Sequence, residues 1–166
     1  MNRLLLRAGL LGALLVSLYV GWILLFPSPE RIIQKRLARI AQLASVSNQE
    51  GPLARLANSQ KLTTFCARDV EIRLEIPGRI SQTLNGREEL LQAVMAARST
   101  LNPLKVEFLD VGVVVGGDKQ SAVARLTAKA SFPGERIPEV QELKFAFRRI
   151  DHDWVIQQAE TVRTLH

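Results

Sequence analysis

Few residues of this 166-residue chain are of the types that carry out chemistry, and each lacks an evident partner nearby in the sequence. Cys66 is the only cysteine, which excludes an intramolecular disulfide and a cysteine-rich metal site. The two histidines, His152 and His166, are too few for a zinc site. We therefore expect neither a metal ion nor a cofactor.

The remaining candidates for acid, base or nucleophile each have a simpler structural explanation. Asp69 follows a predicted helix and is typical of a cap or turn, and Asp110 interrupts an apolar alternation and indicates a β-bulge. His152 falls in a predicted hairpin turn, and Cys66 follows Phe65 on an apolar helix face. Gly116-Gly117 is a turn and not a phosphate loop, because no helix follows it. The sequence thus predicts no catalytic residue.

The last predicted hairpin places a set of side chains on one face of a sheet. With His152 and Asp153 as a two-residue turn, Phe147 faces Gln158 and Phe145 faces Glu160. An apolar concave face with a few convergent polar groups is typical of a ligand pocket, and a bulge would reverse this arrangement. The alternative is a structural ion pair between Arg149 and Glu160. The pocket candidates are Phe145, Phe147, Arg149, Trp154, Ile156, Gln158 and Glu160.

A long apolar stretch precedes these elements. Ala8 to Phe26 contains 19 mostly apolar residues without a charge. As a helix this stretch is about 28 Å long, close to the thickness of the hydrocarbon core of a bilayer. Tyr19 and Trp22 lie in its last turns, as is typical of residues at the headgroup level. We expect residues 1–28 to form a short tail and a single membrane-spanning helix.

A cleaved signal peptide is the alternative, because Arg3 and Arg7 precede the apolar stretch. The stretch is longer than usual for such a peptide and no pair of small residues marks a cleavage site. Basic residues lie on both sides, so the positive-inside rule gives no clear orientation. Short tails before an anchor usually stay in the cytoplasm, so we expect the following domain in the periplasm or outside the cell.

The positive charge of the chain is concentrated near this stretch. The sequence has a formal net charge of +6 and a pI of about 10.1, values that suggest nucleic-acid binding. From Gly51 onward, however, 16 basic residues face 14 acidic ones, and nucleic-acid binding is not expected. Arg31, Lys35, Arg36 and Arg39 follow the stretch on a helix; they form either a solvated helix face or a surface on anionic headgroups.

The elements that position these residues follow from the spacing of apolar side chains. Helices are predicted over Pro29 to Ala44 and Pro52 to Cys66, and a third begins after Asn85 and closes at Asn102-Pro103. Alternation predicts strands over Val70 to Ile76, Ile80 to Leu84 and throughout the chain from Lys105 onward. This order favours an α+β domain over residues 29–166, with three helices on one bent antiparallel sheet of four to six strands.

Three segments resemble the nuclear transport factor two-like (NTF2-like) superfamily. They are Phe65 to Val70 (FCARDV), Asn85 to Leu90 (NGREEL) and Ile150 to Ile156 (IDHDWVI), and the resemblance covers roughly Pro29 to the C-terminus. The superfamily includes SnoaL-like cyclases, ketosteroid isomerases and scytalone dehydratase. The resemblance implies a cone-shaped half-barrel that encloses a pocket. Ketosteroid isomerase activity is disfavoured, because the only tyrosine, Tyr19, lies in the predicted anchor.

Two functions are compatible with these observations. The first is a membrane-tethered, non-catalytic binding or assembly module, with a membrane-protein partner or a second copy as its partner. Assembly subunits of type IV secretion systems are similar in having one membrane helix before such a domain. The second is an enzyme or carrier of the SnoaL-like type, for a small apolar molecule bound in the concave pocket.

Overall fold

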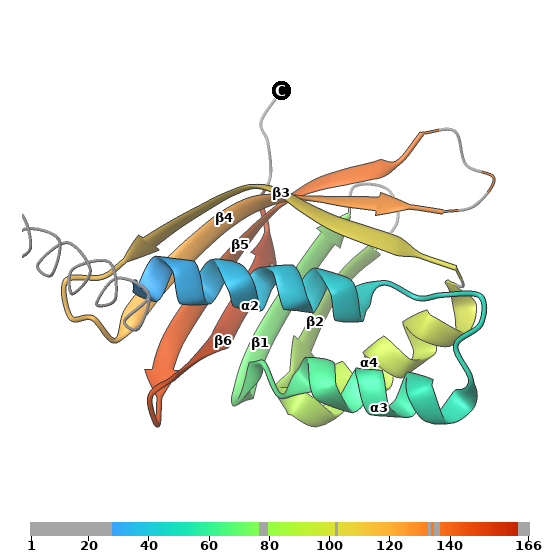
Figure 1. Ribbon diagram of the computed structural model, residues 1–166, viewed down its shortest axis with the longest axis horizontal. Coiled ribbons are helices and arrows are strands. Elements are labelled where there is room, and N and C mark those ends of the chain that lie inside the picture. The colour runs from blue at the N-terminus through green and yellow to red at the C-terminus, as the bar shows by residue number, and fades with distance from the viewer. Residues whose placement is uncertain (1–27, 77–79, 102, 133, 135–136, 163–166) are drawn as a thin grey trace, which may run out of the picture.

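The computed structural model describes residues 28–76, 80–101, 103–132, 134 and 137–162. They form three helices and six strands (Figure 1), as the sequence predicts. In chain order these are α2 (Pro29–Ala44), α3 (Pro52–Thr63), β1 (Cys66–Ile76), β2 (Ile80–Asn85), α4 (Gly86–Thr100), β3 (Lys105–Val115), β4 (Ser121–Ser131), β5 (Glu139–Ile150) and β6 (Asp153–Thr161).

The six strands form one mixed sheet in the order β2-β1-β6-β5-β4-β3. Neighbouring strands are antiparallel except β1 and β6, which are parallel. The prediction of a purely antiparallel sheet is therefore wrong at this one junction. Alternation of apolar residues marks a strand but carries no information on the direction of its neighbour, which tertiary packing decides.

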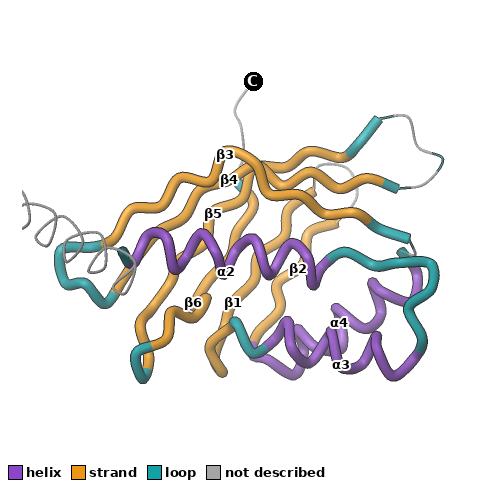
Figure 2. Tube along the Cα trace, viewed as in Figure 1, coloured by secondary structure: helices purple, strands orange, loops and turns teal. Residues whose placement is uncertain are grey.

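The helices cover one face of the sheet. Figures 1 and 2 show α2 crossing the strands, with α3 and α4 side by side beneath the other end of the sheet. Ser28 is the N-cap of α2, where its hydroxyl oxygen accepts a hydrogen bond from the backbone N–H of Arg31 at 3.4 Å. The buried face of α2 includes Ile33, Leu37 and Ile40, which confirms the predicted apolar stripe.

One hydrophobic core joins α2 and the concave face of the sheet. Its members come from every strand except β3, which contributes half-buried residues. Phe145, Phe147 and Trp154 supply most of its aromatic volume, and small residues opposite them on β4 let the layers approach. The buried cluster consists of Ile33, Leu37, Ile40, Cys66, Val70, Leu84, Leu90, Ala122, Ala124, Leu126, Phe145, Phe147, Trp154, Ile156 and Ala159.

The first strand begins earlier than predicted. Helix α3 ends at Thr63, and Cys66 already belongs to β1. The backbone N–H of Ile156 on β6 donates to the carbonyl oxygen of Phe65 at 2.9 Å, so pairing with a distant strand extends β1 backwards. Asp69 therefore lies within a strand and does not cap a helix.

Two other local predictions meet different outcomes. The predicted bulge at Asp110 is confirmed, because φ is 53° there and the β3–β4 register shifts between Leu109 and Gly112. At the start of α4 the sequence predicts a capping box, with Asn85 as the N-cap and Glu88 as its acidic partner, but Glu89 accepts the backbone N–H of Asn85 instead, at 2.7 Å. The φ of +79° at Gly86 changes the geometry of this first turn, and a Cβ there would lie 3.4 Å from the carbonyl oxygen of Arg68.

The predicted anchor, with Ala8, Tyr19, Trp22 and Phe26, lies outside the described residues. Within the described part of the chain, no helix has both the length and the apolar character needed to cross a bilayer.

Candidate functional site

The β5–β6 hairpin has a different register from the one predicted. Ile150 pairs with Asp153, so the two turn residues are Asp151 and His152, with φ of 47° and 70°. Positive φ at both central residues is what a two-residue hairpin turn of type I′ requires. The register then shifts again, because Phe147 pairs with Ile156 while Ala146 pairs with Gln158.

This second shift separates the predicted pocket residues. Gln157 is the extra residue of a bulge, so Gln158 and Glu160 lie on the outer face of the sheet, away from the helices. Glu160 pairs there with Lys144, whose Nζ lies 2.7 Å from its Oε1. The prediction that Gln158 and Glu160 face the pocket is wrong, and so is the alternative ion pair between Arg149 and Glu160.

Four of the other pocket candidates do lie together on the concave face. Phe145, Phe147, Trp154 and Ile156 retain 7%, 3%, 2% and 3% of their exposure. The ring centroids of Phe145 and Phe147 are 6.4 Å apart, and both side chains belong to the core cluster that α2 covers. These residues therefore fill this part of the concave face with their own side chains.

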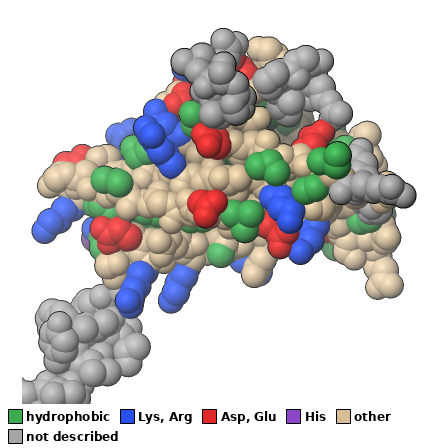
Figure 3. Space-filling view, turned by 90° about the horizontal axis from the view of Figure 1, so that it is seen from above, with side chains coloured by type: hydrophobic (Ala, Val, Ile, Leu, Met, Phe, Trp, Pro, Cys, Tyr) green, Lys and Arg blue, Asp and Glu red, His purple; other side chains and the backbone are tan. Residues whose placement is uncertain are grey.

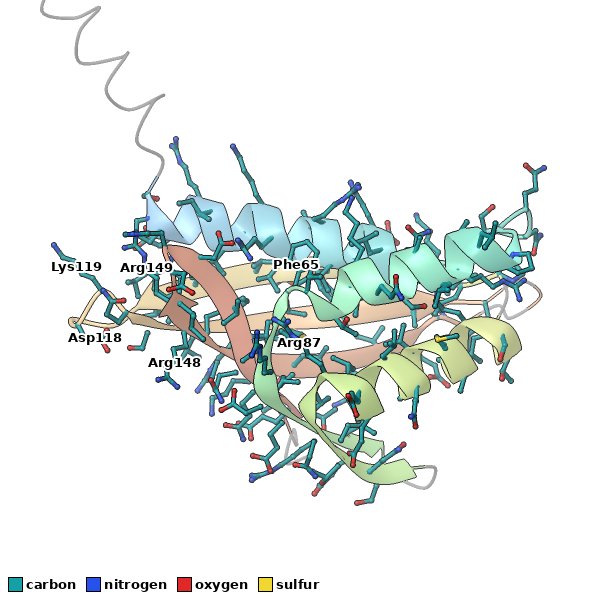
Figure 4. The ribbon with its side chains drawn as sticks, turned by 90° about the horizontal axis from the view of Figure 1, so that it is seen from below. Phe65, Arg87, Asp118, Lys119, Arg148 and Arg149 are labelled. Carbon is teal, nitrogen blue, oxygen red and sulfur yellow. The ribbon has the colours of Figure 1, made fainter. Side chains whose placement is uncertain are left out.

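The fifth candidate, Arg149, lies at the end of the sheet, near the start of α2 (Figure 4). Its backbone N–H donates to the carbonyl oxygen of Gln120 at 2.8 Å, which ties the β5–β6 end to the β3–β4 turn. A hollow of about 420 Å³ lies between the two turns, lined by Gln120, Arg149, Asp151 and His152. We call it the turn hollow. The side chains of Arg149, Asp151 and His152 form no hydrogen bond or ion pair with any described residue.

One of the four basic residues assigned to a membrane surface has a different role. The Arg36 guanidinium donates to the backbone carbonyl of Trp154 at 2.8 Å and pairs with Asp153 at 2.5 Å. It also lies 5.8 Å from the centre of the Phe65 ring. Arg36 therefore joins α2 to the start of β6, and it is not available to a lipid surface. Arg31, Lys35 and Arg39 remain exposed, and Arg39 donates to the side-chain oxygen of Gln42 at 2.9 Å.

Cys66 is buried, as predicted, in the core. Burial raises the pKa of its thiol to about 11, although the nearby Arg87 guanidinium opposes the rise. Arg87 Nε donates to the backbone carbonyl oxygen of Cys66 at 2.7 Å, so Arg87 holds the strand and not the sulfur. A thiol in this state is a poor nucleophile.

Asp69 lies exposed on the outer side of the molecule. Its carboxylate accepts a hydrogen bond from the side-chain amide of Gln157 at 3.0 Å. This bond lowers the pKa of Asp69 below its ordinary value, and the positive charge of Arg148 contributes. The carboxylate therefore stays ionised and holds the bulge of β6 against β1.

A buried polar cluster was not identified in the sequence. Arg98 and Glu50 retain only 3% and 8% of their side-chain exposure, and their ion pair measures 2.6 Å. Asn58 donates to the same Glu50 oxygen at 2.6 Å, and Arg98 also donates to the carbonyl oxygen of Leu43. The available signal was the spacing of Arg98, which follows Leu90 and Val94 at helical intervals and so lies on the buried face of α4.

The cluster joins the end of α2, the loop after it, α3 and α4. The pKa of Glu50 is lowered below its ordinary value. Burial alone would raise this pKa, but the hydrogen bond from Asn58 and the hydrogen bond and positive charge of Arg98 together have a larger effect. In the ranges that the structure describes, no three His, Cys, Asp or Glu residues gather closely enough to hold a metal ion.

Comparisons with known proteins identify the fold. No family model matches the sequence, and no curated protein matches it. The structure is similar to that of an NTF2-like protein of unknown function from Pseudomonas putida KT2440, with a TM-score of 0.64 and 13% identity over 82% of this chain and 87% of that one. A proposed scytalone dehydratase from Novosphingobium aromaticivorans gives 0.59 and 13%, over 81% and 83%.

A proposed aromatic ring hydroxylase from Novosphingobium aromaticivorans gives a TM-score of 0.62 at 11% identity, over 82% and 90% of the two chains. Other similar structures are described as having a cystatin-like fold. The chain therefore has the NTF2-like, cystatin-like α+β fold. At such low identity the likeness establishes the fold alone, and the neighbours are mostly of unknown function or proposed enzymes.

Proposed function

We propose that this protein is a membrane-tethered binding or assembly module, in which the apolar stretch Ala8 to Phe26 anchors an NTF2-like domain. The domain lies in the periplasm or outside the cell, and its partner is a membrane protein or a second copy. The stretch is long enough to span a bilayer and ends three residues before α2 begins. The domain is thus held directly at the membrane.

The main support for a binding role is that the protein's own side chains fill the concave face of the sheet. Trp154 is 2% exposed, and Ile33 and Leu37 of α2 are fully buried in the same cluster. Close packing of this kind leaves little room for a ligand among the aromatic residues. Recognition by such a domain therefore uses its outer surfaces.

The outer face of the sheet offers a short apolar row. Val114 pairs with Val123 across β3 and β4, and Val123 pairs with Ala146 across β4 and β5. Val114 is 72% exposed and Val123 is 37% exposed. Figure 3, which views the molecule from above, shows hydrophobic side chains dispersed among charged ones. Small protein–protein interfaces commonly have an apolar centre and a polar rim, and this apolar row surrounded by charged side chains has the same arrangement.

Crosslinking in intact membranes tests this proposal. The unmodified chain is expected to give a discrete crosslinked species that Val114→Lys removes, because a charge in the row disrupts its packing. Leu53→Lys is the matched control, since Leu53 is 84% exposed on α3. A chain that stays monomeric under all crosslinking conditions, or a species that both variants retain, argues against the assembly role.

A second candidate is a carrier or enzyme for a small apolar molecule. Half-buried Phe108, Ala128 and Leu143 lie beside the core, and the Phe108 and Phe145 rings are 6.2 Å apart. The two proposed enzymes among the structural neighbours also favour this candidate. It predicts that the full chain enhances the fluorescence of an anilinonaphthalene sulfonate probe and that Leu143→Gln abolishes the enhancement. Equal enhancement by the variant would contradict it.

A further inference from the structure

The turn hollow lies at the end of the domain from which the anchor must depart. Figures 1 and 4 place the β3–β4 turn, the β5–β6 turn and the start of α2 at the same end of the domain, where Figure 4 labels Arg149 and Lys119. Phe26, the last residue of the apolar stretch, and Pro29, the first of α2, are three residues apart. Three residues extend about 11 Å at most. This step rests on the proposed tether, which brings this end of the domain to the headgroups.

The side chains of the hollow carry opposite charges that do not neutralise each other. Arg149 is cationic and Asp151 is anionic, and both line the hollow without an ion pair between them in the described structure. His152 and Gln120 add side-chain N–H groups that can donate hydrogen bonds. A purely anionic headgroup would be attracted by Arg149 but repelled by Asp151. A headgroup that carries both charges satisfies both residues.

The type of cation can also be deduced. A quaternary ammonium is usually held by a cage of aromatic rings, and none of the four lining residues is Phe, Tyr or Trp. A primary ammonium instead donates hydrogen bonds to a carboxylate, which Asp151 supplies. A volume of about 420 Å³ lies within the range of small-molecule sites.

We propose that the turn hollow binds the headgroup of phosphatidylethanolamine, with its phosphate on Arg149 and His152 and its ammonium on Asp151. The membrane lipid is the source, because the hollow lies at the anchor end of the domain. Binding there holds the domain in a fixed orientation on the bilayer. The anchor alone would fix the position of the domain at the membrane but not its orientation.

The test uses the full chain in liposomes, with a spin label at Lys119→Cys; the native Cys66 is buried, and the unmodified chain is the control for its labelling. Collisions of the label with a water-soluble nickel chelate report its exposure. A label held on the bilayer is shielded on one side, so the collision rate is expected to fall about twofold when phosphatidylethanolamine replaces half of the phosphatidylcholine. Arg149→Gln and Asp151→Asn are each expected to abolish the fall.

Arg125→Gln serves as the control, because Arg125 lies on the outer face of the sheet, in register with Lys144. It should retain the fall. An equal or larger fall with phosphatidylglycerol would show that charge alone attracts the domain, and would overturn the proposal. An unchanged collision rate in protein that resists alkaline carbonate extraction would overturn the headgroup site and leave the tether intact. Release of the protein by carbonate would overturn the tether itself, and the headgroup site with it.

Discussion

At the scale of single residues, the ion pair of Arg98 and Glu50 places two opposite charges in the interior of the fold. Each charge has lost its water and is compensated by the other, by Asn58 and by the backbone of Leu43. Removing one partner leaves an uncompensated buried charge, which costs more than the pair itself contributes. The cluster also joins three helices at one point, so its loss loosens all of them.

Replacing Arg98 with methionine is therefore expected to lower the free energy of unfolding by about 3 to 5 kcal/mol. Arg125→Met, at an exposed position on β4, should change the free energy of unfolding by less than about 0.5 kcal/mol. Urea unfolding followed by circular dichroism measures both. Equal losses in the two variants would contradict a structural role for the buried pair.

The same cluster predicts a loss of stability in acid. The pKa of Glu50 lies below the value of 4.5 typical of the unfolded chain, so the folded protein binds the proton more weakly. The stabilisation is present above pH 4.5 and disappears as the pH falls through the folded pKa. In Glu50→Gln, the free energy of unfolding should depend less on pH in this range. If the pH dependence of the free energy of unfolding is the same in the variant, other carboxylates cause the acid sensitivity.

Cys66 makes the opposite prediction, at high pH. Its folded pKa of about 11 exceeds the unfolded value of 9.0, so the native state holds this proton more tightly. The resulting stabilisation is complete below pH 9 and declines between pH 9 and 11. The native thiol should react with a disulfide reagent at pH 8 only as fast as the protein unfolds, and urea should restore rapid labelling. Rapid labelling of folded protein would contradict its burial.

At the scale of elements, the bulge at Gln157 decides which side chains of β6 face the core. Trp154 and Ile156 lie before it and Ala159 after it, yet all three are buried on the concave face. In an unbroken alternation that included Gln157, Trp154 and Ile156 would share one face and Ala159 would lie on the other. The bulge therefore lets two core segments of opposite parity share one strand.

Deleting Gln157 is expected to leave the same side chains on the concave face, because Ile156 and Gln158 then lie opposite the consecutive residues Phe147 and Ala146 in an unbroken ladder. The cost is therefore limited to the lost hydrogen bond to Asp69, about 1 kcal/mol, the same as in Gln157→Ala, which keeps the bulge. Thermal unfolding compares the two variants, and similar melting temperatures are expected. A much lower melting temperature of the deletion variant would show that the sheet needs the bulge itself.

In the β5–β6 hairpin, the sequence predicts the strands and their apolar face but not the bulge. Alternation around Phe145 and Phe147 correctly indicated a strand with an apolar face, because local burial determines that pattern. The position of the bulge depends on pairing with β1 and on Asp69, residues more than 80 positions away. Such contacts leave no local pattern, so Gln158 and Glu160 were placed on the wrong face.

At the scale of the whole molecule, the proposed tether predicts the side of the membrane on which the domain lies. The unmodified chain has one cysteine, Cys66, which is buried, so it serves as its own unlabelled control. Lys119→Cys places a thiol on an exposed turn. A maleimide that cannot cross membranes is expected to label this variant in spheroplasts before lysis. Labelling only after lysis would place the domain in the cytoplasm.

The position of β6 has a consequence for how the chain is made. Of the described elements, β6 is the last to be synthesised, yet it lies between β1 and β5 in the interior of the sheet. Until it emerges from the ribosome, the hairpin of β1 and β2 and the β3–β4–β5 meander have no shared strand. The sheet therefore closes only after β6 has been synthesised. A domain that must cross a membrane unfolded would benefit from this order, because its sheet closes only once the C-terminal strand arrives.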